Sequence, residues 1–356
     1  MKKEIKLEHL KKLDEYRSSI ISHPPLRSLF FELTLRCNEK CIHCGSSCND
    51  VKSVELPQEE YIRILDEVKR DFDISRMMLN ITGGEPLLRK DFFDIMAYAK
   101  KLGFTWGMTT NGTLVDDDVA KKLYDCGMKT VSVSIDGLED THDRLRSRKG
   151  AFKETMRGIN ALVNLQKFNH VQVTTVINHE NFSEILPLFE LLGDIDIDSW
   201  RIVNIEPMGR AKKHPELVLT NEEYKYLFDF IKEKRTQGYP ICYGCGHFLG
   251  LDYEREVRDW YFLCNAGLYT ASIASNGDIL SCLDIERRQE LIQGNILKDN
   301  LRDVWDNRFK FFRKDLSCLN TKCAECDQNR FCHGGSFHSW DYDKNEPIVC
   351  FKDILF

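Results

Sequence analysis

Residues 37–44 read Cys-Asn-Glu-Lys-Cys-Ile-His-Cys, which places thiols at Cys37, Cys41 and Cys44. They follow the apolar run Leu-Phe-Phe-Glu-Leu-Thr-Leu at residues 29–35, which predicts a buried strand. A tight loop after that strand can direct three sulfur atoms toward one small metal centre. A 4Fe–4S cube has four irons that each take a ligand, so three cysteines leave one iron open.

A structural zinc site is the alternative interpretation of this loop. Cys48 could supply a fourth sulfur, and four thiolates would close a tetrahedral zinc site. The chain has no apolar signal core at its N-terminus and no apolar run of about 18 residues, so we predict a cytoplasmic protein. Because the cytosol keeps thiols reduced, the 14 cysteines are expected to bind metals or clusters. Most of them lie in 37–48 and 242–350.

Length and charge narrow the class of protein. The 356 residues suit two or three units and a sizeable core. The formal net charge of −6 disfavours nucleic-acid binding, because proteins that follow a phosphate backbone are usually basic. We therefore expect neither a nucleic-acid nor a membrane partner.

Strand and helix signals alternate through the first two thirds of the chain. Strands are predicted at 29–35, 76–82, 105–110, 130–135, 171–177 and 200–205. Helices are predicted at 57–72, 91–102, 116–126, 152–166, 182–192 and 220–235, the last opened by a capping box. Six successive βα units predict an α/β fold, a partial (β/α)6 TIM-like barrel.

The two ends of the chain lack this alternation of strands and helices. Residues 1–27 predict a short helical segment, 28–237 the barrel, and 238–356 a cysteine-rich extension. Within the extension, residues 269–282 predict a hairpin around an Asn-Gly turn, and 300–313 a short amphipathic helix.

Motifs follow the ends of several predicted strands. Gly83-Gly84-Glu85-Pro86 follows the second strand, Asn111-Gly112 the third and Asp136-Gly137 the fourth. Each could be a simple turn. Active sites of such barrels lie at the C-terminal ends of the strands. Because all three motifs lie at such ends, they predict one site on that rim, beside the cysteine loop.

Taken together, the CxxxCxxC loop and the GGEP motif resemble the radical SAM superfamily over residues 28–210. The resemblance implies a 4Fe–4S cluster whose open iron chelates S-adenosylmethionine (SAM). It also implies release of a 5′-deoxyadenosyl radical that abstracts hydrogen from an unactivated carbon, with the protein supplying geometry.

The same resemblance implies a set of SAM-contacting residues. Gly83 and Gly84 would let the backbone approach the methionine moiety, and Glu85 would lie near its ammonium group. Further contacts are implied for Thr110, Asn111, Ser134, Asp136 and Arg146, the last facing the methionine carboxylate. Capping of the sheet end or surface charge is the alternative for this second group.

The last third resembles the SPASM extension of that superfamily, which implies two auxiliary 4Fe–4S clusters. The pattern is matched by Cys264, Gly277, Cys282, Cys323, Cys326, Cys332 and Cys350. Zinc is the alternative for the CxxC pair and its partners. The pattern expects one more cysteine where the chain has Ser336. Cys245 is the predicted substitute, Cys242 and Cys318 are alternatives, and an open iron is a further one.

The resemblance implies an enzyme that oxidatively modifies a peptide or protein substrate, by cross-linking or dehydrogenation. The alternatives are a SPASM enzyme acting on a small molecule or cofactor precursor such as a tetrapyrrole, and a non-catalytic zinc-binding module. We expect a reducing partner such as flavodoxin or ferredoxin. Because 1–27 is too short for a leader-binding domain, leader recognition would need a separate leader-binding protein or another surface. The sequence does not identify a catalytic base.

Overall fold

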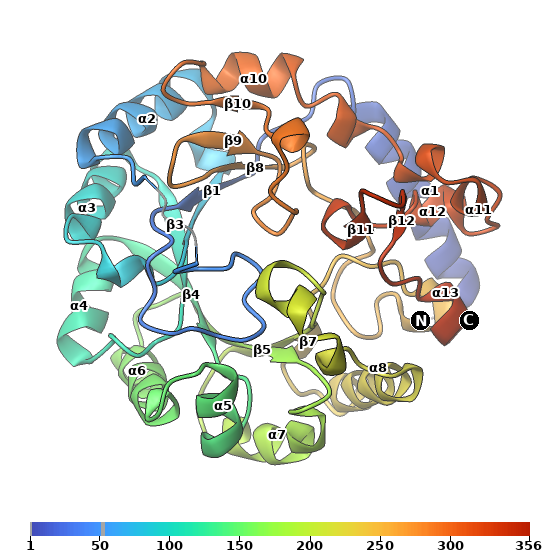
Figure 1. The fold of residues 1–356 in the computed structure, drawn as a ribbon, viewed down its shortest axis with the longest axis horizontal. Coiled ribbons are helices and arrows are strands. Elements are labelled where there is room, and N and C mark those ends of the chain that lie inside the picture. Colours follow the sequence, from blue (N-terminus) through green and yellow to red (C-terminus); the bar gives the residue numbers. More distant parts are fainter. Residues whose placement is uncertain (1, 51–53) are drawn as a thin grey trace.

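The computed structural model describes residues 2–50 and 54–356, and within these ranges the strands form a ten-stranded sheet. The sheet order is β10-β9-β8-β1-β2-β3-β4-β5-β6-β7. It curls into an incomplete ring with helices on its outer side (Figure 1). The predicted units 1–27 and 28–237 include residues 1 and 51–53, which lie outside the described residues.

The six predicted strands form the centre of the sheet and run parallel. They are β1 (Ser28–Glu32), β2 (Met78–Thr82), β3 (Thr105–Thr110), β4 (Met128–Ser134), β5 (His170–Ile177) and β6 (Ser199–Asn204). The covering helices are α2 (Gln58–Asp71), α3 (Phe92–Leu102), α4 (Asp117–Asp125), α6 (Ala151–Leu165), α7 (Ile185–Gly193) and α8 (Asn221–Thr236). Thr220 and Glu223 form the predicted capping box before α8. The predicted fold class is confirmed.

The C-terminal third extends this sheet at both edges, which the sequence did not predict. Strand β7 (Ile241–Tyr243) pairs parallel with β6. Strand β8 (Thr270–Ile273) pairs parallel with β1. The predicted hairpin joins β8 to β9 (Asp278–Leu280), and β10 (Gly294–Asn295) follows. The sheet therefore crosses the predicted boundary at 238, whereas β1 begins at the predicted boundary at 28. The division into domains remains a prediction.

Two helices differ from the predictions. Helix α5 (Glu139–Leu145) was not predicted. The helix predicted at 300–313 is wrong in length, because α10 (Leu301–Asn307) ends at Asn307 and a separate 3-10 turn follows at Phe311–Arg313.

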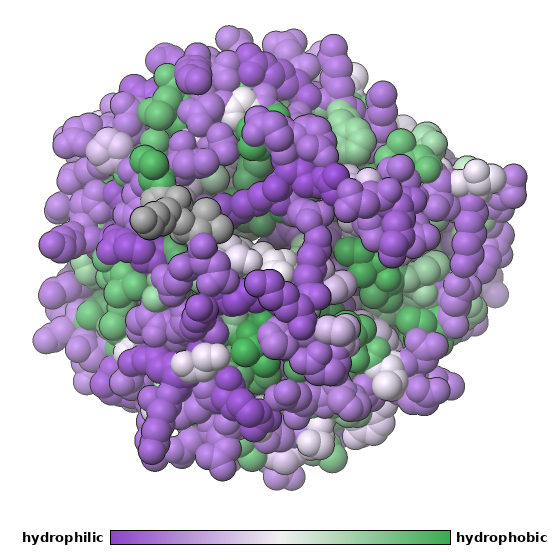
Figure 2. All heavy atoms as spheres, in the orientation of Figure 1, coloured by the Kyte–Doolittle hydropathy of each residue, from purple (hydrophilic) through white to green (hydrophobic). Residues whose placement is uncertain are grey.

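The remaining elements lie at the chain ends. They are α1 (Lys3–Ile20), α9 (Gly250–Tyr253), α11 (Thr321–Ala324), α12 (Asn329–Cys332), α13 (Lys352–Leu355), and the small sheet of β11 (Trp340–Asp341) and β12 (Glu346–Pro347). In the described part of the chain, no helix has both the length and the apolar character needed to cross a bilayer. Figure 2 shows that the face seen in Figure 1 is mostly hydrophilic.

Side chains inside the ring are largely polar, whereas those under the helices are apolar. Leu29, Phe31 and Leu79 face the helices and are fully buried. On the inner side, the Ser132 and Thr174 hydroxyls lie 2.7 Å apart, and both accept from Gln172 Nε2 at 3.2 Å. Closed TIM barrels instead fill this space with bulky apolar residues. The interior is therefore suited to polar contents.

The GGEP motif is packed directly against the start of the cysteine loop. Gly84 N–H donates to Thr34 O at 2.7 Å, and Glu85 N–H donates to Arg36 O at 2.9 Å. A Cβ added at Gly84 would lie 2.1 Å from Arg36 O. Glycine at this position is thus needed for the backbone-to-backbone approach that fixes the loop.

We expect Gly84→Ala to lower the free energy of unfolding by about 1–3 kcal/mol, because the new methyl group overlaps a carbonyl that cannot move freely. Thermal unfolding of the anaerobically purified protein measures this as a Tm lowered by several degrees. The matched control is Gly193→Ala at the end of α7, where a Cβ would meet nothing within 4 Å. Equal melting temperatures for the two variants would contradict the argument.

Candidate cluster and cofactor site

The cysteine loop is held by two polar side chains that clamp its backbone. Asn49 accepts from Cys37 N–H at 2.9 Å and donates to Cys37 O at 2.8 Å. The buried Arg210 donates to Cys41 O at 2.7 Å and to Cys48 O at 2.6 Å. The loop conformation is therefore fixed by residues outside the CxxxCxxC motif.

The three thiols lie in unequal environments. Burial raises the pKa of Cys37 to about 11 and that of Cys41 to about 12. A hydrogen bond from the Cys48 thiol lowers the pKa of Cys44 to about 5. Metal coordination deprotonates thiols outright, so a bound cationic centre would provide the charge compensation that Cys37 and Cys41 lack.

Sulfur spacing favours a multi-iron centre over a single zinc ion. Zinc–sulfur bonds of about 2.3 Å in a tetrahedron place the sulfurs only about 3.8 Å apart. Among the described residues, no set of three or more cysteines brings its ligand atoms within 4.8 Å of one another; the group that does is Glu206, His247 and His338. In a 4Fe–4S cube each cysteine binds a different iron, so wider spacing is expected.

The Glu85 carboxylate joins the ends of β2 and β3. It is fully buried and accepts from the Thr110 hydroxyl at 2.9 and 3.0 Å and from Asn111 N–H at 2.9 Å. Burial raises the pKa of Glu85 to about 7. The Asn111 amide in turn donates to Asn38 Oδ1 at 2.8 Å and lies 3.9 Å from Cys37 Sγ. Three predicted site residues thus meet beside the cysteine loop.

Asp136 and Arg146 are brought together, but they pair with each other. Arg146 lies 2.5 Å from Asp136 and 3.3 Å from Glu39, and His43 Nε2 lies 3.1 Å from Asp136. Burial alone would raise the pKa of Asp136, but Arg146 and His43 hold it well below its ordinary value. The unpredicted helix α5 positions Arg146. The predicted contacts of Asp136 and Arg146 with SAM remain predictions.

Three other predicted positions lie on the same rim. Ser134 ends β4, in register with Thr174 of β5. A Cβ on Gly83 would lie 2.3 Å from Thr34 O, so Gly83, like Gly84, is needed for packing against the protein's own backbone. Their contacts with SAM also remain predictions.

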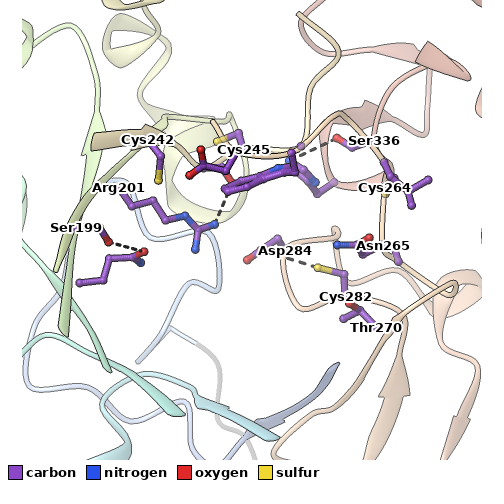
Figure 3. A pocket seen from close by; sticks show the side chains of 18 of the residues that line it. Ser199, Arg201, Cys242, Cys245, Cys264, Asn265, Thr270, Cys282, Asp284 and Ser336 are labelled. Carbon is purple, nitrogen blue, oxygen red and sulfur yellow. Dashed lines mark hydrogen bonds between the residues drawn. The ribbon is translucent and has the colours of Figure 1, made fainter. Parts of the chain in front are cut away.

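A cavity of about 640 Å³ collects cysteines from the C-terminal third. Its lining includes Cys242, Cys245, Cys264, Cys282 and Ser336. Figure 3 shows these side chains around the space, with Arg201 of β6 beside Cys242 and Cys264 and Cys282 on the other side. Cys318 is exposed and is not part of this lining, so the geometry favours Cys242 or Cys245 over Cys318 as the extra ligand.

A second pocket, of about 60 Å³, is lined by all four cysteines predicted as the other set: Cys323, Cys326, Cys332 and Cys350. Gln328 N–H lies 3.4 Å from Cys326 Sγ, and Lys352 Nζ lies 3.8 Å from it. These donors would stabilise a thiolate at Cys326. Cys126, at the end of α4, lies outside both pockets, and its thiol contacts Phe93 O of α3.

Sequence reasoning missed a buried polar group between the two cysteine-lined cavities. His247 Nε2 lies 2.6 Å from Glu206 Oε1, and His338 joins them. The first cavity includes His338 in its lining, and the second includes His247. These residues are far apart in the sequence and share no motif. The one sequence signal was the position of the two histidines. His247 lies two residues after Cys245, and His338 lies two residues after Ser336.

Comparisons with known proteins agree with this geometry. Family models match the radical SAM superfamily at residues 31–192 and the SPASM iron–sulfur cluster-binding domain at residues 264–327. The AdoMet-dependent heme synthase of Methanosarcina barkeri is 29% identical over 92% of this chain and 97% of that protein. Mycofactocin maturase MftC of Mycolicibacterium smegmatis is 30% identical over 86% of this chain and 77% of that protein.

Solved structures share the fold. Streptococcus suis SuiB bound to S-adenosylmethionine superposes with a TM-score of 0.71 at 20% identity, over 90% of this chain and 76% of that one. anSMEcpe with bound AdoMet gives a TM-score of 0.74 at 21% identity, over 92% and 94%. The chain therefore belongs to the radical SAM superfamily of enzymes, carries a SPASM domain, and has SAM and 4Fe–4S clusters as its cofactors.

Proposed function

We propose that this enzyme oxidatively modifies a peptide or protein, by cross-linking or dehydrogenation, with the reacting segment bound inside the strand ring. The supporting observation is the single cavity that joins inward-facing residues of β5 and β6, such as Gln172 and Arg201, to Cys264 and Cys282. A substrate in this cavity lies next to the thiols proposed to hold an auxiliary cluster. Oxidation requires an electron acceptor close to the substrate, which this arrangement supplies.

In this proposal the cysteine loop binds the SAM cluster through Cys37, Cys41 and Cys44. When bound, the cluster and SAM together supply a 5′-deoxyadenosyl radical that abstracts a hydrogen atom from carbon. The chain's own residues supply position and charge. Glu85 would accept from the SAM ammonium group, since its carboxylate is buried at the same rim.

The C-terminal cysteines are assigned to two auxiliary clusters. Cys323, Cys326, Cys332 and Cys350 form the set for the second pocket, and Cys245, Cys264 and Cys282 contribute to the first cavity. A reductant such as flavodoxin or ferredoxin would supply the electron for SAM cleavage. A separate leader-binding protein would present the substrate peptide.

Polar groups of the ring interior can orient the substrate. His170 Nε2 lies 2.8 Å from the Ser199 hydroxyl, and both line the cavity. Arg201 donates to Gly244 O at 3.0 Å, and its Nε has no hydrogen-bond partner among the described residues. Because Arg201 lines the cavity, its guanidinium would meet a substrate carboxylate bound there.

Relatives support a peptide as the substrate. SuiB has been solved bound to its precursor peptide SuiA, and anSMEcpe with the Cp18Cys peptide. Each of these structures covers 93% of this chain. The fold thus accommodates a peptide, and mycofactocin maturase adds a maturation enzyme among the sequence relatives.

A carboxylate-bearing tetrapyrrole is the second candidate substrate. Arg201 in the cavity, with no carboxylate partner among the described residues, favours it, because propionate side chains would pair with a guanidinium. The heme synthase relative, matched over 97% of its length, points the same way.

We expect Cys41→Ala to abolish the formation of 5′-deoxyadenosine from SAM, because it removes one of three thiolates from the proposed SAM cluster. The measurement is chromatography of anaerobic, dithionite-reduced reactions. Cys126→Ala, at a thiol that contacts Phe93 O, is the control and should retain cleavage. Continued cleavage by Cys41→Ala would remove the loop from its assigned role.

We expect Cys326→Ala to lose one cluster while still cleaving SAM, because its pocket is lined by none of the SAM-site residues. Iron should fall from about 12 to about 8 per chain, at four per cube. Cys318→Ala, at an exposed cysteine, should keep the full iron content. Unchanged iron in Cys326→Ala, or loss of SAM cleavage, would contradict the two-site arrangement.

Titration with iron coproporphyrin III separates the two substrate candidates. For a peptide-modifying enzyme we expect no saturable shift of the Soret band. A shift that saturates at one equivalent, and that Arg201→Gln weakens about tenfold by removing a charged hydrogen bond, would replace the peptide by a tetrapyrrole. Arg235→Gln is the control, because Arg235 lines the cavity but is already paired with Asp259 at 2.5 Å.

A further inference from the structure

We propose that His338 is a nitrogen ligand of the auxiliary cluster that Cys264 and Cys282 hold. This inference rests on the cluster placement proposed above and deepens it. A cube needs four ligands, and two or three of the cavity's thiols can be assigned to it from their positions. The structure identifies an imidazole in the remaining space.

The turn that carries His338 is built against Cys264. Phe337 and Ser339 bound a single 3-10 turn, and Phe337 N–H hydrogen-bonds the Cys264 sulfur. Cys282, whose thiol lies 3.8 Å from Asp284, lines the same cavity as His338. His338 therefore enters the cavity on the wall that holds these two thiols.

The opposite side of the His338 ring faces the segment of Cys245. A Cβ added at Gly246 would lie 3.2 Å from His338 Cε1, so glycine leaves room for the imidazole next to Cys245. His338 Nε2 also lies 3.5 Å from the Ser336 hydroxyl, which itself lines the cavity. The imidazole thus lies between the Cys264 wall and the Cys245 wall, where a fourth ligand is required.

His170 and Cys242 are further histidine and cysteine side chains in the cavity lining. His170 lies on β5 and already contacts the Ser199 hydroxyl at 2.8 Å. Cys242 lies on β7, in register with Arg201 of the neighbouring strand β6. Both therefore belong to the strand wall of the cavity, whereas His338 belongs to the Cys264 wall.

A buried carboxylate supports the ligand role. Histidines that bind metals usually direct their second ring nitrogen to a carboxylate or carbonyl, which fixes the ring orientation. Glu206, His247 and His338 each place one ligand atom within 4.8 Å of the others. Glu206 Oε2 is buried and has no hydrogen-bond partner in the described part of the chain. Glu206 is thus the positioning residue for His338.

Imidazole in place of a thiolate has an electrochemical consequence. It is a neutral ligand, so it leaves the cluster less negative and raises its reduction potential, as two histidines do in Rieske centres. A cluster with a raised potential accepts an electron from a substrate radical more readily. The cluster gains one electron in that step, and the substrate loses it.

Pulsed EPR on the full chain carrying Cys37→Ala, Cys41→Ala and Cys44→Ala tests the proposal. This parent protein retains only the auxiliary clusters, with about 8 irons expected. With ¹⁵N-histidine labelling, we expect strong histidine nitrogen coupling to one reduced cluster. The coupling should persist in His170→Gln, the matched control from the same cavity, and should disappear in His338→Gln.

The His338→Cys variant distinguishes the loss of a cluster ligand from a general failure of the protein to hold the cluster. If His338→Gln falls to about 4 irons, His338→Cys should restore about 8, with a more negative potential and no nitrogen coupling. Nitrogen coupling that survives in His338→Gln, or is absent from a parent with about 8 irons, would overturn the ligand assignment alone.

Two further outcomes would also overturn it. A parent with only about 4 irons would remove the cluster from this cavity and would overturn the cluster placement as well. A stoichiometric divalent ion that disappears in both Glu206→Gln and His338→Gln, without nitrogen coupling, would assign these residues to a mononuclear metal site instead.

Discussion

The pairing of β1 on both of its edges is the constraint on which the rest of the structure depends. One edge pairs with β2, which leads into Gly83-Gly84-Glu85, and the other pairs with β8, which leads toward Cys282. The cysteine loop leaves the end of the same strand. Strand β1 therefore positions both the proposed SAM site and the first auxiliary cavity, and the sheet fixes the distance between them.

Charged side chains then hold in place the cysteine loop that β1 positions. Arg210, which follows β6, donates to the carbonyls of Cys41, within the cysteine loop, and of Cys48, just after it. Arg146 is held by Asp136 and Glu39 under the same loop, and its own carbonyl accepts from Lys40 N–H at 3.2 Å. Removing one partner of such a buried pair leaves an uncompensated charge, which is far more costly than losing an exposed ion pair. The loop is thus held by buried charged side chains outside the three cysteines.

The sequence predicted the βα alternation well, because hydrophobic periodicity and caps act locally. The six central strands and the capping box at Thr220 follow from such local signals. The parallel pairing of β8 with β1 could not be predicted, since it joins segments far apart in the chain. For the site, cysteine spacing identified the sets that meet in the two cavities. Spacing could not show that Arg146 pairs with Asp136, or that Glu206, His247 and His338 converge, because no motif links them.

The β1–β8 pairing also orders events during synthesis. Ser28 pairs with Thr270, so the sheet edge beside the first cysteine loop stays open until most of the chain has left the ribosome. Long-range contacts of this kind form late, because the entropy of closing a long loop must first be overcome. The cavity lined by Cys264 and His338 is therefore complete only after translation has passed residue 338.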